Sequence, residues 1–253
     1  MATIEPRLKQ ISQSIEFNQQ RILRFENSLC NALLNGVTPQ GNGKSKKGKV
    51  PILKDTLKGS ELMMMNFETF DLPTELGRFL GQLERYRLAI ALTGDNGAGK
   101  THFSFALAEL FSKSGFSIKY YSLEMGLGNK VKELVQLYNC HDIALTQNGK
   151  LNQVQKDAKL YDVIVVDSYG KLEANSKDFD KLRNAFPHTI FIFIFQKTNS
   201  GTMRGGSSIK FDSSMTINVI KREGQRIAVM EKSRYGTISW EYDISVKKTT
   251  EKM

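Results

Sequence analysis

The sequence predicts an α/β fold with a mainly parallel sheet, helices on its faces and an antiparallel edge made by the C-terminal strands. Aliphatic runs at residues 88–92, 161–168 and 189–195 contain few polar side chains, which is typical of strands buried on both faces. Segments with helical spacing separate these runs, and this alternation indicates a parallel sheet. After residue 214, three strand-like segments are separated by short turns, which indicates antiparallel strands.

The elements of this domain follow from local patterns. A helix near residues 75–83 precedes the first buried strand, at 88–92. The helical pattern that begins at Phe103 ends at Gly115, a residue that suits the left-handed position after a helix. The remaining elements are, in order, a strand at 118–123, helices at 130–137 and 151–159, a strand at 161–168, a helix at 176–185, a strand at 189–195, and strands at 215–220, 227–231 and 237–242.

Four segments are expected along the 253 residues. Residues 1–36 carry apolar side chains at helical spacing, and we expect a helical N-terminal arm that docks a partner or oligomerises, or else folds back on the core. Residues 37–60 are rich in Gly, Lys and Ser, as in a flexible basic linker. Residues 61–246 hold the α/β domain, because this length suffices for one proper core, and residues 247–253 form a tail.

Composition disfavours several classes of protein. Cys30 and Cys140 are too few for a disulfide framework and lack CxxC spacing, so we expect reduced thiols in a cytoplasmic protein. No charged and then apolar leader opens the chain, and the apolar runs have strand length, so we expect neither a secreted nor a membrane-spanning protein. The formal net charge of +10 modestly favours a polyanionic partner such as nucleic acid.

A phosphate-binding loop lies between the first buried strand and the helix after it. The segment is Gly94-Asp95-Asn96-Gly97-Ala98-Gly99-Lys100-Thr101, which fits the pattern G-x-x-x-x-G-K-[ST]. Glycines let backbone N–H groups face a phosphate, and the helix N-terminus adds partial positive charge. Lys100 is expected to reach the outer phosphates and Thr101 to ligate Mg²⁺. We therefore predict that this loop, together with His102, binds a nucleoside triphosphate with Mg²⁺.

A second magnesium contact is expected at the end of the strand at 161–168. Four consecutive aliphatic residues in this strand are followed by Asp167, whose carboxylate stands at the carboxyl end of the strand. In phosphate-loop NTPases, an acid at this position holds Mg²⁺ through water. Asp162 begins the strand and therefore lies at the wrong end of the sheet.

Four further short elements resemble those of DnaB-type replicative helicases and their RecA-like relatives. Ser122-Leu-Glu-Met125 is similar to their S-L-E-M element, and the N-K-x-D element that GTPases use does not occur. Gln196 stands where these families place a glutamine that senses the γ-phosphate and starts a DNA-contacting loop. Arg204–Ile209 looks like the R-x-S-G-S-I segment, and Lys232–Gly236 is similar to the K-N-R-F-G element of DnaB and RadA proteins.

This resemblance implies a RecA-like fold and a role for each matching residue. Glu124 would orient and deprotonate the attacking water, and Gln196 would sense the γ-phosphate. Lys232 and Arg234 would reach the nucleotide of a neighbouring subunit. The expected contacts to single-stranded DNA are Lys197, Arg204 and Lys210.

The function expected from the resemblance is hydrolysis of ATP with Mg²⁺ by a DNA-acting protein, which works as a ring or filament in replication, recombination or repair. One alternative is a helicase loader or accessory ATPase that docks a replication protein through its N-terminal helices. Another is a nucleotide-gated scaffold. A small-molecule phosphotransferase is disfavoured, because no lid rich in Arg lies between the motifs.

The chain departs from the family in three places. Leu76–Gly81 replaces the usual L-D-x-x-x-G-G-x-x-x-G lead-in, and Ile209–Met215 lacks the usual paired acid. The N-terminal arm is shorter than the primase-contacting domain of a replicative helicase. A stand-alone RecA-like ATPase is therefore the expected architecture.

Overall fold

The computed structural model describes residues 56–64, 69–196, 212–235 and 238–251, in two units that span Met1–Asn66 and Phe67–Met253. In the first unit the described element is the short helix α2 (Gly59–Met63). The predicted N-terminal arm and most of the predicted linker lie outside the described residues. The second unit contains the sheet.

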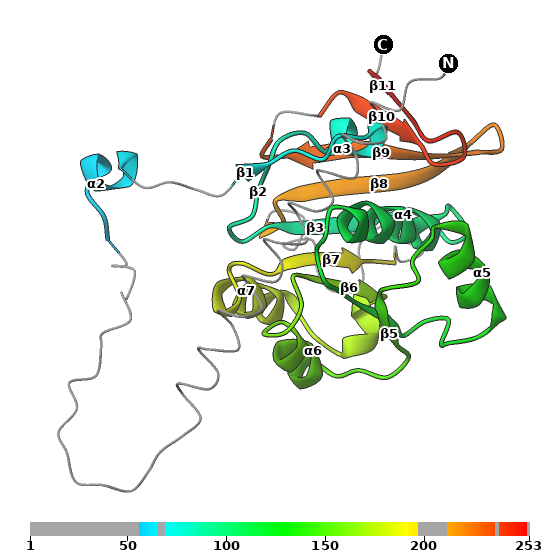
Figure 1. Cartoon of the computed structure of the whole chain (residues 1–253), viewed down its shortest axis with the longest axis horizontal. Helices are drawn as coiled ribbons and strands as arrows, with labels where there is room; N and C mark the ends of the chain where they lie inside the picture. Colours follow the sequence, from blue (N-terminus) through cyan, green and yellow to red (C-terminus); the bar gives the residue numbers. More distant parts are fainter. Residues whose placement is uncertain (1–55, 65–68, 197–211, 236–237, 252–253) are drawn as a thin grey trace, which may run out of the picture. The chain divides into compact units, whose positions relative to one another are not determined.

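A nine-stranded sheet organises the second unit, with the order β11-β10-β9-β8-β3-β7-β6-β4-β5 (Figure 1). Its strands are β3 (Ala89–Thr93), β4 (Ile118–Ser122), β5 (Ala144–Thr146), β6 (Val163–Asp167), β7 (Ile190–Ile194), β8 (Met215–Arg222), β9 (Gln225–Ser233), β10 (Trp240–Asp243) and β11 (Lys248–Glu251). The strands from β8 across to β5 pair in parallel, whereas β8, β9, β10 and β11 pair antiparallel in chain order. The predicted α/β fold with an antiparallel C-terminal edge is confirmed.

Helices cover both faces of this sheet. They are α3 (Glu75–Leu80), α4 (Lys100–Lys113), α5 (Asn129–Leu137), α6 (Leu151–Asp157) and α7 (Ser176–Ala185), with a 3-10 turn η1 (Tyr169–Leu172). One buried cluster joins the sheet to α3, α4 and α5 through residues such as Phe103 and Leu134. The other joins it to α6, η1 and α7 through residues such as Val154 and Phe179. In the described ranges, no helix combines the length and the apolar character that crossing a bilayer requires.

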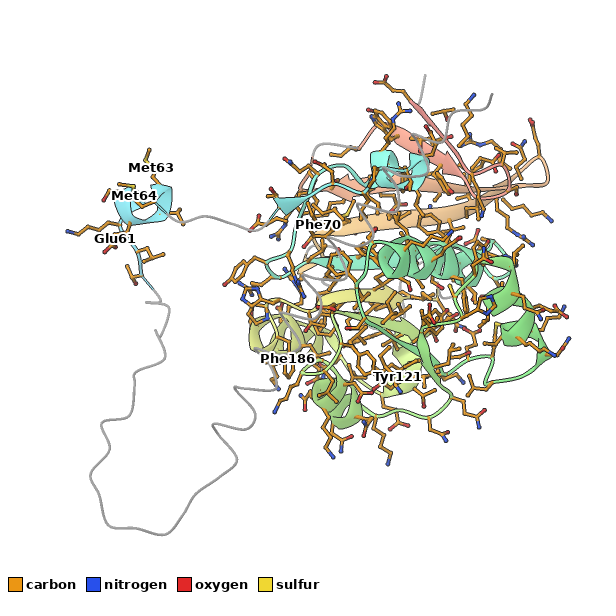
Figure 2. The ribbon with its side chains drawn as sticks, viewed as in Figure 1. Glu61, Met63, Met64, Phe70, Tyr121 and Phe186 are labelled. Carbon is orange, nitrogen blue, oxygen red and sulfur yellow. The ribbon has the colours of Figure 1, made fainter. Side chains whose placement is uncertain are left out.

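The strands that pair in parallel end at a common edge, which we call the carboxyl edge, and begin at the opposite, amino edge. In Figure 1 the arrow of β7 points to the right, towards the carboxyl edge, and the β8–β9 hairpin turns at that end. Figure 2 labels Phe70, in β1 (Thr69–Phe70), and Phe186, which caps α7, on the left at the amino edge. The loops after β3, β4, β6 and β7 therefore meet at the carboxyl edge, where open α/β sheets bind ligands.

The structure also contains strands that the sequence pattern does not predict. β11 occupies residues expected to form a tail, and its sequence Lys-Thr-Thr-Glu has no apolar alternation. It is held by pairing with β10 and by Thr249, whose backbone N–H donates to Glu75 Oε2 at 3.0 Å. The three-residue strand β5 pairs with β4, and β1 pairs with β2 (Leu83–Glu84). Local composition does not reveal these strands, because pairing with a neighbour stabilises them.

Candidate functional site

The phosphate-binding loop connects β3 to α4 at the carboxyl edge. Its three glycines have positive φ angles of 145° at Gly94, 74° at Gly97 and 108° at Gly99, which L side chains rarely adopt. A Cβ atom at Gly94 would lie 2.2 Å from the carbonyl oxygen of Val219 in β8. Gly94 therefore lets β8 lie directly against the loop. Between the glycines, Asp95 and Asn96 are exposed and Ala98 is buried.

Lys100, the first residue of α4, is buried beneath this loop. Its Nζ donates hydrogen bonds to the carbonyl oxygens of Gly94, at 2.9 Å, and of Asp95, at 2.8 Å. Both acceptors are uncharged, and a phosphate oxygen accepts from an ammonium group more strongly than a neutral carbonyl does. The structure thus holds Lys100 at the phosphate-binding loop, where the sequence predicts that it contacts the outer phosphates.

Thr101 and Asp167 meet beside the loop, as the sequence predicts. Thr101 Oγ1 donates to Asp167 Oδ2 at 2.7 Å, and Asp167 ends β6 with 2% of its surface exposed. The other carboxylate oxygen, Oδ1, is buried and has no hydrogen-bond partner among the described residues. Buried polar atoms normally have a partner, and a hydroxyl and a carboxylate are oxygen ligands that suit Mg²⁺. The two residues fit the predicted magnesium contact.

The environment of Asp167 also changes its acidity. Burial raises the pKa of this carboxyl from its ordinary 3.8 to about 6, and the negative charge of Glu124 adds to the increase. The hydrogen bond from Thr101 and the positive charge of Lys100 lower the pKa and offset part of this effect. Without a bound cation the carboxylate is therefore costly to keep ionised.

We expect Asp167→Asn to stabilise the nucleotide-free protein at neutral pH. The raised pKa means that folding favours the protonated acid, so ionisation of Asp167 lowers the free energy of unfolding as the pH rises from about 4 to about 6. The full effect is about 3 kcal/mol, reached above pH 6. Asparagine keeps an acceptor for Thr101 and carries no charge.

Urea unfolding in EDTA at pH 5 and pH 8 measures this difference. The stability gained by Asp167→Asn should grow by about 1 to 2 kcal/mol between these two pH values. Asp142→Asn, which changes an exposed aspartate, is the matched control and should show no such growth. If the stability gained by Asp167→Asn is independent of pH, Asp167 does not carry a destabilising buried charge at neutral pH.

Glu124 and Gln196 are brought together at the same edge, although 72 residues separate them in the sequence. Glu124 lies in the turn after β4, where its backbone N–H donates to the carbonyl oxygen of Asp167 at 3.0 Å. Gln196 lies just after β7, and its Nε2 donates to Glu124 Oε1 at 2.6 Å. Parallel pairing of β4 with β6 and of β6 with β7 creates this contact.

His102 lies on α4, one residue beyond the phosphate-binding loop. Its ring is half-buried, and Nδ1 lies 3.3 Å from the hydroxyl of Tyr138, the residue that caps α5. Burial, and then the positive charge of Arg226, lower the pKa of His102, so its ring is neutral near pH 7. The structure therefore places His102 next to the loop with its ring against α5.

Arg226 is a site residue that sequence reasoning missed. A Cβ atom at Gly99 would lie 2.6 Å from Arg226 Cδ, so this arginine packs directly on the phosphate-binding loop of its own chain. The sequence does predict a turn at Glu223 and Gly224, and this turn makes the tight hairpin in which Arg226 pairs with Lys221. The pairing of β8 with β3, which brings the hairpin to the loop, could not be read from the sequence.

Lys232 and Arg234 lie at the opposite, amino edge. Lys232 Nζ donates to the carbonyl oxygen of Ser213 at 2.8 Å, and the backbone N–H of Arg234 donates to that of Ser214 at 3.1 Å. They follow β9, an inner strand that runs antiparallel to β8 and so ends where β3 begins. The structure does not bring them to the phosphate-binding loop of their own chain.

The predicted DNA contacts Lys197, Arg204 and Lys210 lie outside the described residues. The described chain stops at Gln196 and resumes at Asp212. Their role stays a prediction.

Comparison with known proteins identifies a matching family model and many similar solved structures, among them the two that follow. The model described as IstB-like ATP binding protein matches residues 81–188, which include the phosphate-binding loop, Glu124 and Asp167. The flagellar accessory protein FlaH from Methanocaldococcus jannaschii is 17% identical with a TM-score of 0.53, over 74% of this chain and 96% of that chain. A second solved structure, described as an ATPase domain, is 12% identical with a TM-score of 0.56, over 73% of this chain and 90% of that chain. No curated protein matches the sequence.

These similarities agree with the geometry of the site. At such low identities the two solved structures establish the fold, which is the RecA-like fold that the short elements of the sequence predict. The family model and the phosphate-binding loop agree on ATP as the ligand. The chain is therefore an ATP-binding P-loop protein with the RecA-like fold.

Proposed function

We propose that the chain hydrolyses ATP and acts on DNA, as an assembly in which neighbouring copies share nucleotide sites. The observation that carries this proposal is the 2.6 Å hydrogen bond between Gln196 Nε2 and Glu124 Oε1 at the carboxyl edge. A carboxylate beside the phosphate-binding loop can accept a proton from water, and a glutamine bonded to it can respond to the γ-phosphate. Simple nucleotide binding would need neither group.

The reaction is attack of water on the γ-phosphorus of ATP, which yields ADP and phosphate. Lys100 and the backbone N–H groups of the loop bind the phosphates and offset their charge. Thr101 and Asp167 would hold Mg²⁺, which neutralises further phosphate charge when it is bound. Glu124 orients the water and takes its proton, so that the oxygen forms its bond to phosphorus as the bond to the β-phosphate oxygen breaks.

Action on DNA is supported by charge and by the position of the glutamine. The chain has a formal net charge of +10, and the segment with Lys197, Arg204 and Lys210 directly follows Gln196. Gln196 would thus transmit a change at the γ-phosphate to the basic segment that follows it. A loader or accessory ATPase that acts on a protein ring is the alternative function.

ATP turnover with and without single-stranded DNA, measured at two salt concentrations, tests this function. We expect DNA to stimulate turnover and the stimulation to weaken at higher salt, because contacts to phosphates release counterions. Pull-down against single-stranded DNA and against a replicative helicase separates the two functions. If DNA does not change the rate of ATP turnover and the protein is retained by the helicase in the pull-down, the loader function is favoured.

Lys100→Ala is expected to weaken ATP binding by more than tenfold, which is more than about 1.4 kcal/mol. Without the ammonium group, the loop's backbone donors leave the charge of the β- and γ-phosphates largely uncompensated. Titration with a fluorescent ATP analogue measures the affinity. Lys113→Ala, at the exposed far end of the same helix, is the control and should bind normally. Retention of affinity within tenfold in Lys100→Ala would overturn the assignment of the loop.

Neutralising Lys197 and Arg204 together should reduce the salt dependence of single-stranded DNA binding. The slope of log affinity against log salt should fall by about one to two, since each phosphate contact contributes about 0.7. Affinity measured at several salt concentrations gives the slope. The double change of Lys130 and Lys132, two exposed lysines on α5, should leave it unchanged. An unchanged slope in the first variant would remove these two residues from the DNA contact.

A further inference from the structure

An arginine-lined pocket of about 640 Å³ lies at the amino edge of the sheet. Arg87, which precedes β3, Arg183, on α7, and Arg234, after β9, all line it. Among the described residues around the pocket, Glu84 supplies the carboxylate. Pockets of this size suit small ligands, and three guanidinium groups with one carboxylate favour an anionic ligand. We call this the arginine pocket.

The positive charges at the arginine pocket crowd one another. Arg183 has 4% of its surface exposed, and its Nη1 donates to the carbonyl oxygen of Asp212. Burial, followed by the charges of Arg87 and Arg234, lowers the pKa of Arg183, and the carboxylates of Asp180, whose Oδ1 lies 3.7 Å from Arg183 Nη1, and of Asp212 offset part of this effect. Burial, followed by Arg234 and Arg183, also lowers the pKa of Lys232 nearby. An anion bound among these groups would relieve their repulsion.

Arg87 is held with an unsatisfied donor at this pocket. Its backbone has a φ angle of 56°, in the left-handed region that arginine rarely adopts. The backbone is fixed by its N–H, which donates to the carbonyl oxygen of Pro187 at 2.6 Å, and by its carbonyl oxygen, which accepts from Ser214 Oγ at 3.2 Å. The side-chain Nε is buried and has no hydrogen-bond partner among the described residues. A buried guanidinium N–H without a partner suits a phosphate oxygen.

The arginine pocket cannot serve the nucleotide of its own chain. Arg87 precedes β3 and the phosphate-binding loop follows it, so the strand's rise of about 16 Å separates the two edges. Head-to-tail contact between copies would place the amino edge of one against the carboxyl edge of the next, as in a ring or filament. In that arrangement the arginine pocket faces a phosphate-binding loop.

We propose that the arginine pocket binds the phosphate groups of the nucleotide held by the next copy of the chain, with Arg87 as a direct contact and Arg183 as the buried charge behind it. This inference rests on the proposed function, and it adds Arg87 and Arg183 to the two residues, Lys232 and Arg234, that the motif implies. A polyphosphate is the ligand chemistry that fits. The phosphate chain of DNA is the competing source.

Arg87→Asn in the full-length chain tests the proposal. Asparagine adopts positive φ angles more easily than arginine, so the variant should unfold at the same or a higher temperature than wild type. We expect ATP affinity at the variant's own loop to change by less than about threefold, and turnover to fall about 10- to 100-fold, the usual effect of a lost charged hydrogen bond. Lys181→Asn, an exposed lysine on α7, is the matched control and should turn over normally.

Mixing experiments locate the defect. Arg87→Asn mixed with Lys100→Ala should recover activity, because about a quarter of the interfaces in an equal mixture pair an intact loop with an intact pocket. Arg87→Asn mixed with Arg234→Ala should recover none, since every interface then carries one damaged pocket.

The outcomes separate this inference from the proposed function. If wild type does not hydrolyse ATP, the proposed function fails. If Lys100→Ala and Arg234→Ala complement each other but Lys100→Ala and Arg87→Asn do not, the proposed function stands and the arginine pocket fails. Normal ATP turnover in Arg87→Asn would overturn the proposal. If the slope of log affinity for single-stranded DNA against log salt also falls by about 0.7, the value for one phosphate contact, the pocket binds DNA instead.

Discussion

Arg234→Ala is expected to bind ATP as wild type does and to hydrolyse it about 10³ to 10⁵ times more slowly, the usual effect of removing an arginine finger. Arg234 follows β9 at the amino edge, one strand length from the phosphate-binding loop of its own chain. A guanidinium in that position can stabilise the transition state only at a nucleotide of a neighbouring copy. Lys232, anchored on Ser213, would support it.

Two measurements check the shared site. Turnover per subunit of the wild type should rise with protein concentration as the assembly forms. Arg234→Ala mixed with Lys100→Ala should recover partial activity, because some interfaces combine an intact loop with an intact arginine. Arg78→Ala, an exposed arginine on α3, is the control and should remain active. If the two variants co-assemble but the mixture does not hydrolyse ATP, or if a dilute monomer turns over at the full rate, the shared site is ruled out. Arg234 then has only a structural role.

Glu124→Gln is expected to retain ATP and to lose turnover by about 10² or more, which is the usual contribution of a general base. The substitution preserves the size of the side chain. Its amide oxygen can still accept the hydrogen bond from Gln196 Nε2, so the contact between the segments that follow β4 and β7 should persist. The lost property is the ability to take a proton from the attacking water.

Single-turnover hydrolysis and ATP titration separate these two effects. Glu133→Gln, on the exposed face of α5, is the matched control and should behave as wild type. Glu124→Gln also addresses the scaffold alternative, in which nucleotide binding rather than turnover matters. If the variant hydrolyses ATP at the normal rate, Glu124 only stabilises the turn after β4, and another residue must act as the base.

The sequence by itself determined the phosphate-binding loop and the fold around it. Glycines 94, 97 and 99, followed by Lys100, form a local pattern whose conformation depends on residues that are adjacent in the chain. Asp167 could be placed for a similar reason, since the aliphatic run before it must be a buried strand and an acid at its end stands at the carboxyl edge. Glu124 and Gln196 followed from the resemblance, and their hydrogen bond agrees with the predicted parallel sheet.

Only the tertiary structure decided which neighbours the later strands have. The pairing of β8 with β3 joins segments about 125 residues apart, and no local pattern specifies it. This pairing sets Arg226 on the phosphate-binding loop and sends Arg234 to the amino edge, where Arg87 and Arg183 complete a pocket. Likewise, β11 is formed by its pairing with β10, in residues that the sequence predicts to be a tail. The physical reason is that backbone pairing and buried charge depend on contacts between distant segments, whereas turns and strand-length apolar runs are fixed by adjacent residues.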